Sequence, residues 1–93
     1  MITLGEIQRR MQNLNNWALE EQSIVKDYSF PSFKEALDFV NKVGIIAEKQ
    51  NHHPDILISY NKVRLILTTH SEKGLTEKDF KVAEEIDKVE KIA

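Results

Sequence analysis

Three apolar, helix-like segments of this chain each begin with a hydroxyl residue that is followed three positions later by an acidic residue. In such a capping box the hydroxyl accepts a hydrogen bond from the third helical N–H, and the carboxylate reaches back to the cap residue. The pairs are Thr3 with Glu6, Ser32 with Glu35, and Thr76 with Asp79. The chain is therefore expected to contain three helices, which start near its beginning, its middle and its end.

The segments between these helix starts alternate apolar and polar residues, a pattern typical of β-strands. The expected strands cover residues 17–19, 23–30, 55–60 and 63–69, with short turns at 20–22 and at Asn61-Lys62. The central helix must end before Pro54, because proline disfavours helical geometry in the residue before it. The predicted order is α-β-β-α-β-β-α. It defines an α+β fold in which helices cover one face of a four-stranded antiparallel sheet.

Length and composition indicate a single globular domain that spans residues 1–93. A chain of 93 residues is enough for one domain and too short for two. Hydrophobic residues make up 41% and charged residues 30%, an ordinary globular balance. The net charge is −2 and the basic residues form no stripe, so neither nucleic acid nor an anionic membrane surface is expected as a partner.

Cysteine usage and hydropathy bear on where the protein works. The sequence has no cysteine, which excludes a disulfide framework and a thiolate metal site and fits a reducing compartment. No apolar run approaches the ~18 residues of a membrane span. The first ten residues are amphipathic and lack the apolar core of a signal peptide. These features predict a cytoplasmic protein.

The three histidines are expected to meet at the open end of the second hairpin. His52 and His53 are adjacent, and His70 follows the last expected strand. A turn centred on Asn61-Lys62 pairs residues whose numbers sum to 123 (61 + 62), which places His70 opposite His53. Glu48 precedes His52 by one helical turn and shares a face with it if the helix persists that far.

A carboxylate beside imidazoles suits proton transfer, because it fixes the ring and favours its charged form. Free histidine titrates near ~6.5, so such a ring can give and take protons at neutral pH. Other interpretations remain open on spacing alone. The histidines could be surface or turn residues. Alternatively, all three histidines and Glu48 could bind a zinc ion. Against a metal, adjacent histidines in extended chain point in opposite directions.

Two apolar residues of the central helix lie off the centre of its apolar stripe. They are Phe39 and Ile46. Either they form a second apolar surface that contacts a partner subunit, or they lie at the edge of one wide core face.

The region around the histidines resembles the pterin-4a-carbinolamine dehydratase family. The matching pattern is Glu48-x-x-Asn51-His52-His53-Pro54, then Tyr60-Asn61-Lys62-Val63, then Thr69-His70, then Gly74-Leu75-Thr76-Glu77-x-Asp79. The rest of the chain agrees more loosely. The resemblance implies a four-stranded antiparallel sheet with three helices on one face, which agrees with the order predicted above.

The resemblance also implies a reaction. Members dehydrate 4a-hydroxytetrahydropterin to quinonoid dihydropterin, a hydro-lyase step in pterin cofactor recycling. The pterin is the substrate, and no cofactor or metal is expected. By position, His52 and His70 would be the catalytic acid–base pair, with Glu48 supporting them.

By the same resemblance, substrate binding falls to three neighbours of the catalytic pair. His53 would orient the pterin ring, with Asn51 and Pro54 beside it. Asp79 is sufficiently explained as a capping residue and is left out of the predicted site. Members form homodimers or homotetramers. The alternative function is a non-catalytic or dual-role dimerisation or assembly cofactor with the same fold.

Overall fold

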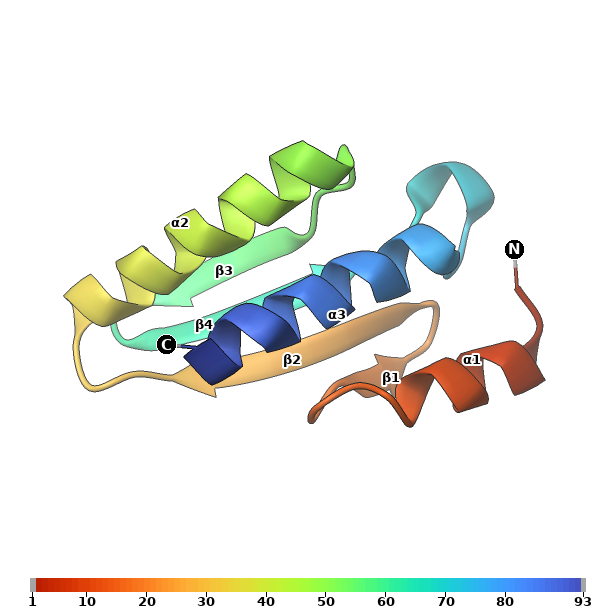
Figure 1. The fold of residues 1–93 in the computed structure, drawn as a ribbon, viewed down its shortest axis with the longest axis horizontal. Coiled ribbons are helices and arrows are strands. Elements are labelled where there is room, and N and C mark those ends of the chain that lie inside the picture. The colour runs from red at the N-terminus through yellow and green to blue at the C-terminus, as the bar shows by residue number, and fades with distance from the viewer. Residues whose placement is uncertain (1, 93) are drawn as a thin grey trace.

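A computed structural model describes residues 2–92 of the chain, with side chains up to Val89. The predicted order of elements is confirmed, with one short 3-10 helix added before the last helix (Figure 1). The elements are α1 (Leu4–Met11), β1 (Ala18–Glu20), β2 (Ser23–Ser29), α2 (Phe33–Gln50), β3 (Asp55–Ser59), β4 (Lys62–Leu67), η1 (His70–Glu72) and α3 (Glu77–Ile92). Each α-helix begins directly after the hydroxyl residue of a predicted capping box.

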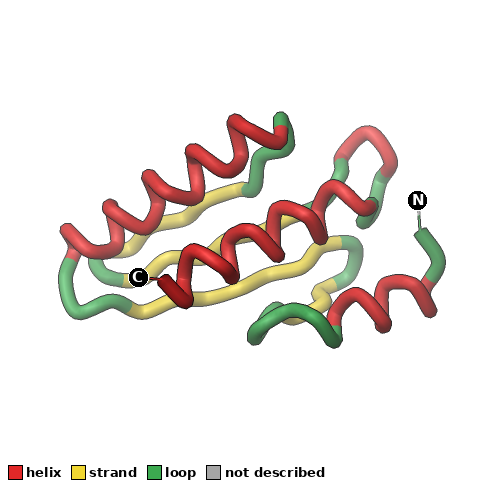
Figure 2. Tube along the Cα trace, in the orientation of Figure 1, coloured by secondary structure: helices red, strands yellow, loops and turns green. Residues whose placement is uncertain are grey.

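The four strands form one antiparallel sheet in the order β1-β2-β4-β3. Helices α2 and α3 lie across one face of this sheet, as the traces in Figures 1 and 2 show. Helix α1 packs beside α3 through Arg10, whose guanidinium lies 5.3 Å from the centre of the Phe80 ring. The same side chain also lies 3.6 Å from Glu77 and 3.5 Å from Glu84. The predicted α+β fold, with its helices on one side of the sheet, is confirmed.

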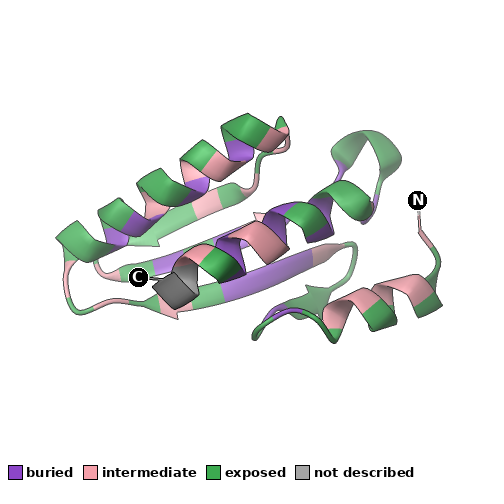
Figure 3. Cartoon of the chain, viewed as in Figure 1, coloured by how far each residue is buried: buried purple, intermediate pink, exposed green. Residues whose placement is uncertain are grey.

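The core lies between the sheet and the helices, where alternate strand residues face inward. Figure 3 shows buried residues on the facing surfaces of β2, β4 and α3. Phe39 of α2 belongs to this core, with its ring centre 4.4 Å from Tyr28 and 5.2 Å from Phe30. Ile46 is half-buried against the same cluster. Of the two interpretations of Phe39 and Ile46, one wide core face is therefore correct. The exposed apolar residues of α2 are Phe33, Leu37 and Ile45.

The predicted register of the second hairpin is wrong by one position in each strand. Ser59 pairs with Lys62, so the turn is Tyr60-Asn61 and paired residue numbers sum to 121 (59 + 62). Tyr60 adopts the left-handed conformation, with φ of 55°, that such a two-residue turn requires. Asn61 fixes the turn, because its side-chain amide donates to the Phe30 carbonyl at 2.8 Å and its own carbonyl accepts from the Phe30 N–H at 2.8 Å.

The opposite face of the sheet carries charged residues. Arg64 of β4 donates from Nε and from a terminal nitrogen to the two carboxylate oxygens of Asp27, at 2.8 and 3.0 Å. The hydrogen bonds to Asp27, followed by the negative charge of its carboxylate, raise the pKa of the Arg64 guanidinium above its usual value. Among residues 2–92, no helix is both long and apolar enough to cross a bilayer.

Candidate active site

The end of α2 turns the chain so that His52 and His53 leave the helix in a defined direction. Asn51 adopts a left-handed conformation with φ of 51° and ψ of 41°. Its N–H donates to the Glu48 carbonyl at 3.2 Å, and the N–H of His52 donates to the Ala47 carbonyl at 3.1 Å. This pair of bonds is a Schellman motif, in which asparagine substitutes for the usual glycine at comparatively low cost. Asn51 thus turns the chain just before the two histidines, and Pro54 follows them in the sequence.

His52 contacts a fully buried carboxylate. Its Nε2 lies 2.5 Å from Oδ1 of Asp79, and the side chains of His52 and Asp79 are 12% and 0% exposed. The other oxygen of Asp79 accepts from the Thr69 hydroxyl at 2.8 Å and from the Thr76 N–H at 2.9 Å. Three hydrogen bonds therefore offset the cost of burying this carboxylate.

Asp79 is the site residue that sequence reasoning missed. The predicted capping box is confirmed, because the Asp79 carboxylate accepts from the N–H of Thr76, the residue just before α3. Capping accounts for only Oδ2, however, and Oδ1 binds His52. The available signal was the residue type, because this position of a capping box usually holds Glu or Gln.

His53 contacts the carboxylate of Glu48, which was expected to lie beside His52. Its Nε2 lies 2.5 Å from Oε2 of Glu48, and the side chains are 54% and 79% exposed. The expectation that Glu48 shares a helical face with His52 is wrong, because α2 ends at Gln50 and the left-handed Asn51 breaks the helical spacing. The site thus holds two histidine–carboxylate pairs, one nearly buried and one in solvent.

His70 occupies the corner between β4 and α3. Thr69 and Gly74 form an isolated antiparallel bridge around this corner, with hydrogen bonds of 3.0 and 3.3 Å. His70 begins η1 and is exposed. Its pairing with position 53 is not observed, because strand pairing ends at Asp55 with Ile66. His70 instead joins the site through its neighbour Thr69, which binds Asp79, the partner of His52.

The carboxylate contacts leave the two adjacent histidines with their Nε2 atoms already engaged. Within the part of the chain that the structure describes, no group of three histidine, aspartate or glutamate side chains is placed to hold a metal ion. The geometry therefore arranges imidazoles with carboxylates in pairs, which is the arrangement that orients a ring for proton transfer.

Similar proteins of known sequence cover almost the whole chain. The sequence profile of the family described as pterin 4 alpha carbinolamine dehydratase matches residues 2–89. A protein of Sulfolobus acidocaldarius, named as a candidate pterin-4-alpha-carbinolamine dehydratase, is 44% identical over 86 residues, which are 92% of this chain and 94% of the relative. A protein of Trichodesmium erythraeum with the same name is 45% identical over 86 residues, 92% of each chain.

Two solved structures of other proteins share the fold. The transcriptional coactivator/pterin dehydratase of Brucella melitensis superposes with a TM-score of 0.89 at 32% identity, over 95% of this chain and 96% of the other. A pterin dehydratase-like protein identified as a RuBisCO assembly factor of the α-carboxysome gives a TM-score of 0.67 at 18% identity, over 83% and 92% of the two chains. The latter likeness concerns the fold alone. With the family profile and the relatives that match along its length, this chain belongs to the pterin-4-alpha-carbinolamine dehydratase family.

Proposed function

We propose that this protein is an enzyme that dehydrates 4a-hydroxytetrahydropterin to quinonoid dihydropterin, in the recycling of a pterin cofactor. The observation that carries the proposal is the contact between His52 and the buried Asp79, in a chain that belongs to this family. A purely structural histidine at a helix end needs no buried carboxylate. A histidine that moves protons gains orientation and charge stabilisation from one.

The reaction requires one proton to be delivered and one to be removed. The C4a–O bond of the substrate breaks, and the oxygen leaves as water after it gains a proton. The N5–H proton is lost, and the N5 electron pair forms the C4a=N5 double bond. No electron leaves the substrate and no bond to the protein forms, so general acid–base groups are sufficient and no separate cofactor is required.

His52 is suited to remove the N5 proton. Its Nε2 lies on Asp79, so Nδ1 is the nitrogen that remains for the substrate. A ring that donates from Nε2 to a carboxylate carries a lone pair on Nδ1, which makes that atom the base. The Asp79 carboxylate then stabilises the positive charge that the ring acquires.

His70 is suited to protonate the leaving oxygen. Its ring is exposed at the corner next to Thr69 and can approach a bound substrate from solvent. His53, held by Glu48, contacts and orients the pterin ring. Asn51 turns the backbone just before the two adjacent histidines. Pro54 restricts the backbone after them, because its ring fixes its own φ.

Substitution of the acid–base pair tests this proposal. His52→Ala and His70→Ala should each lower kcat by about 10²–10⁴-fold, the usual contribution of one general acid or base. The rate of dehydration of 4a-hydroxytetrahydropterin above its spontaneous rate measures the effect. Circular dichroism establishes that both variants remain folded. If the double variant dehydrates the substrate as fast as the wild type, the assignment is wrong.

The assembly proposed for the protein is a homodimer or homotetramer in the cytoplasm. Exposed Phe33, Leu37 and Ile45 give α2 an apolar outer surface, which supports a helix contact between copies. Leu37→Lys should therefore lower the molar mass measured by light scattering, whereas an unchanged mass would reject this contact.

Binding of a protein partner, the alternative function, would survive His52→Ala in a pull-down if that role is independent of catalysis.

A further inference from the structure

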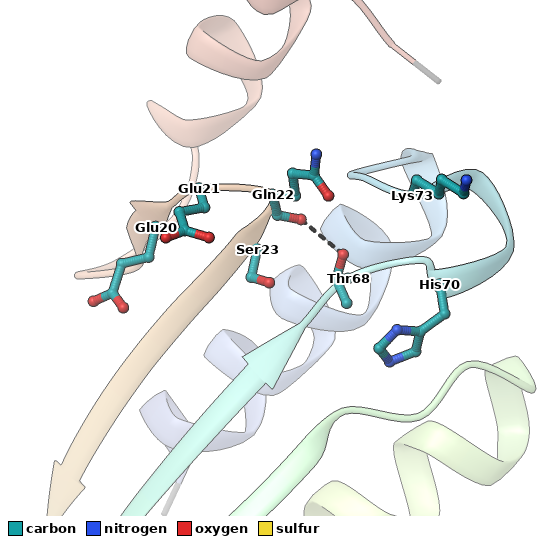
Figure 4. Close-up of a pocket in the computed structure, with 7 residues that line it drawn as sticks. All are labelled: Glu20, Glu21, Gln22, Ser23, Thr68, His70 and Lys73. Atoms are coloured by element: carbon teal, nitrogen blue, oxygen red, sulfur yellow. Dashed lines mark hydrogen bonds between the residues drawn. The ribbon is translucent and has the colours of Figure 1, made fainter.

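Two adjacent threonines after β4 bind different parts of the molecule through their hydroxyls. The Thr68 hydroxyl donates to the Gln22 carbonyl at 2.7 Å and connects the β1–β2 turn to the end of β4, at the open pocket shown in Figure 4. The Thr69 side chain is buried, and its hydroxyl donates to Oδ2 of Asp79 at 2.8 Å. Thr69 is therefore the threonine that contacts the carboxylate bound to His52.

The direction of the hydrogen bonds around Thr69 follows from the number of protons available. A carboxylate only accepts, so the single hydroxyl proton of Thr69 is committed to Asp79. Oγ1 of Thr69 also lies 2.8 Å from Oγ1 of Thr76, and Thr76 must be the donor of this second bond. Oγ1 of Thr76 in turn accepts from the Lys78 N–H at 3.3 Å, in the first turn of α3. The chain of hydrogen bonds thus runs in one direction, from the start of α3 through the two threonines to the carboxylate.

Each hydrogen bond in this chain strengthens the next one. A hydroxyl that accepts a hydrogen bond is polarised and becomes a better donor, and this effect is larger away from water. Thr69 and Asp79 are 7% and 0% exposed, and Thr76 is half-buried. The Thr76 hydroxyl therefore has two roles, because it caps α3 and also polarises the Thr69 hydroxyl toward the carboxylate.

The backbone of Thr69 is itself held in place, which fixes the direction of its hydroxyl. Its N–H donates to the Gly74 carbonyl at 3.0 Å, and its carbonyl accepts from the Gly74 N–H at 3.3 Å. The Thr69 hydroxyl and the Thr76 N–H then both donate to Oδ2 of Asp79. Rotation of the carboxylate would break both bonds, so Oδ1 stays directed at Nε2 of His52.

On the basis of the proposed function, we propose that Thr69 is a positioning residue for the base His52, and that the Thr76 hydroxyl orients Thr69. Both threonines act through Asp79 and are distinct from the histidines that move protons. A base must stay within hydrogen-bond reach of the proton that it removes, and a displacement of about 1 Å can cost a hundredfold in rate. Loss of the chain should therefore lower kcat and leave substrate binding almost unchanged.

Thr69→Val tests the first residue of the proposal, because it keeps the branched shape of the side chain and removes the hydroxyl. It should lower kcat for dehydration of 4a-hydroxytetrahydropterin about tenfold and change KM by less than about twofold, since one hydrogen bond to the carboxylate is lost. Thr69→Ser keeps the hydroxyl and should retain most of the wild-type kcat. Thr68→Val is the matched control, because it removes the hydroxyl of the neighbouring threonine, which donates to a backbone carbonyl, and should leave kcat unchanged.

Thr76→Val tests whether the two hydroxyls act in series, at a position that is less buried than Thr69. In the wild-type background it should lower kcat about two- to fourfold, since the Thr69 hydroxyl loses its donor. In the Thr69→Val background it should not lower kcat further, because the chain is already broken. The midpoint of urea denaturation should fall in both backgrounds, because the cap of α3 is lost in both.

Four results would overturn the positioning role of the threonines. Thr69→Val could keep the kcat of the wild type, Thr69→Ser could lose as much kcat as Thr69→Val, or Thr68→Val could lose as much as either. Thr76→Val could also lower kcat by the same factor in both backgrounds, as expected of a purely structural cap. If Thr69→Val does not fold, Thr76→Val decides alone, and a wild-type kcat in that variant overturns the proposal.

The histidine variants distinguish failure of this inference from failure of the proposed function. If His52→Ala and His70→Ala lose activity and the threonine variants do not, the proposed function stands and the positioning role is wrong. If His52→Ala keeps the kcat of the wild type, the proposed function fails and the positioning role fails with it.

Discussion

Helix α3 contains two buried aspartates that differ in the residues to which they are hydrogen-bonded. Asp79 accepts hydrogen bonds from the Thr69 hydroxyl and the Thr76 N–H and contacts the His52 imidazole. Asp87, about two turns later on the same helix, accepts hydrogen bonds from three donors as well. These are the Asn15 N–H at 2.9 Å, the Trp17 indole N–H at 2.9 Å and the Lys26 ammonium at 3.1 Å. The two side chains are similarly buried and similarly satisfied.

The two aspartates differ in how exposed their hydrogen-bond partners are. Asp87 lies in an enclosed cluster, because Trp17 and Lys26 are only 7% and 3% exposed. It connects the loop after α1 and the middle of β2 to the second half of α3, and its own side chain is only 8% exposed. Asp79 contacts the His52 ring, which remains 12% exposed. A buried carboxylate therefore supports stability at one position and, by our proposal, catalysis at the other.

Among substitutions of the carboxylates, the largest effect is expected from Asp79→Asn. The amide keeps the shape of the side chain and can still accept from Thr69 or Thr76, but it cannot stabilise a charged His52 ring. We expect kcat to fall about 10²–10³-fold with a much smaller change in KM, because the lost interaction acts when the ring takes a proton. Steady-state kinetics measure both constants. A kcat near that of the wild type would reduce Asp79 to a helix cap and end the contrast with Asp87.

Asp87→Asn should have the opposite profile. It removes the negative charge that lies 3.1 Å from the buried Lys26 ammonium, and removal of one partner of a buried ion pair costs about 3–5 kcal/mol of unfolding free energy. Urea denaturation measures this loss. The kcat of the folded enzyme should remain within about twofold of the wild type, since the change does not touch the acid–base pair. A large fall in kcat with unchanged stability would contradict the comparison.

Adding Lys26→Met to Asp87→Asn sharpens the structural half of the comparison. The second change removes the buried ammonium that loses its contact with the Asp87 carboxylate in the first. The double variant should therefore be more stable than the sum of the two single effects, by about 1–2 kcal/mol. A double-mutant cycle from denaturation curves gives this coupling directly. Strict additivity would show that Asp87 acts through Asn15 and Trp17 rather than through Lys26.

Local sequence signals predicted the fold well because they depend on neighbouring residues. The hydroxyls of Thr3 and Ser32 cap their helices as expected, each accepting from the N–H three residues later at 3.2 Å. Long-range contacts were beyond such signals. The bond between Asn61 and Phe30 set the hairpin register, and no periodicity encodes it. The approach of Asp79 to His52, across 27 residues of chain, depends on how α3 packs against the end of α2.

The predicted pairing of the candidate site residues differs from the pairing in the structure. Sequence spacing groups Glu48 with the adjacent histidines and predicts that it lies beside His52. Because the left-handed Asn51 ends the helix, Glu48 contacts His53 instead. An asparagine before two histidines and a proline could have signalled this turn, because asparagine tolerates that conformation better than most residues. Alternation within β2 places Lys26 on the same strand face as Ile24 and Tyr28, and only the tertiary structure shows that the Asp87 carboxylate lies beside it.

The smallest effect is expected from Glu48→Gln, which extends the comparison to a carboxylate in solvent. Glu48 contacts His53 at the same 2.5 Å that separates Asp79 from His52, yet it is 79% exposed. Water and salt screen an exposed pair, so the change should lower kcat/KM by at most about fivefold. The effect should also shrink at high salt, whereas that of Asp79→Asn should not. Equal, salt-independent losses for both variants would mean that burial does not distinguish the two carboxylates. Distance to the imidazole alone would then decide what each contributes.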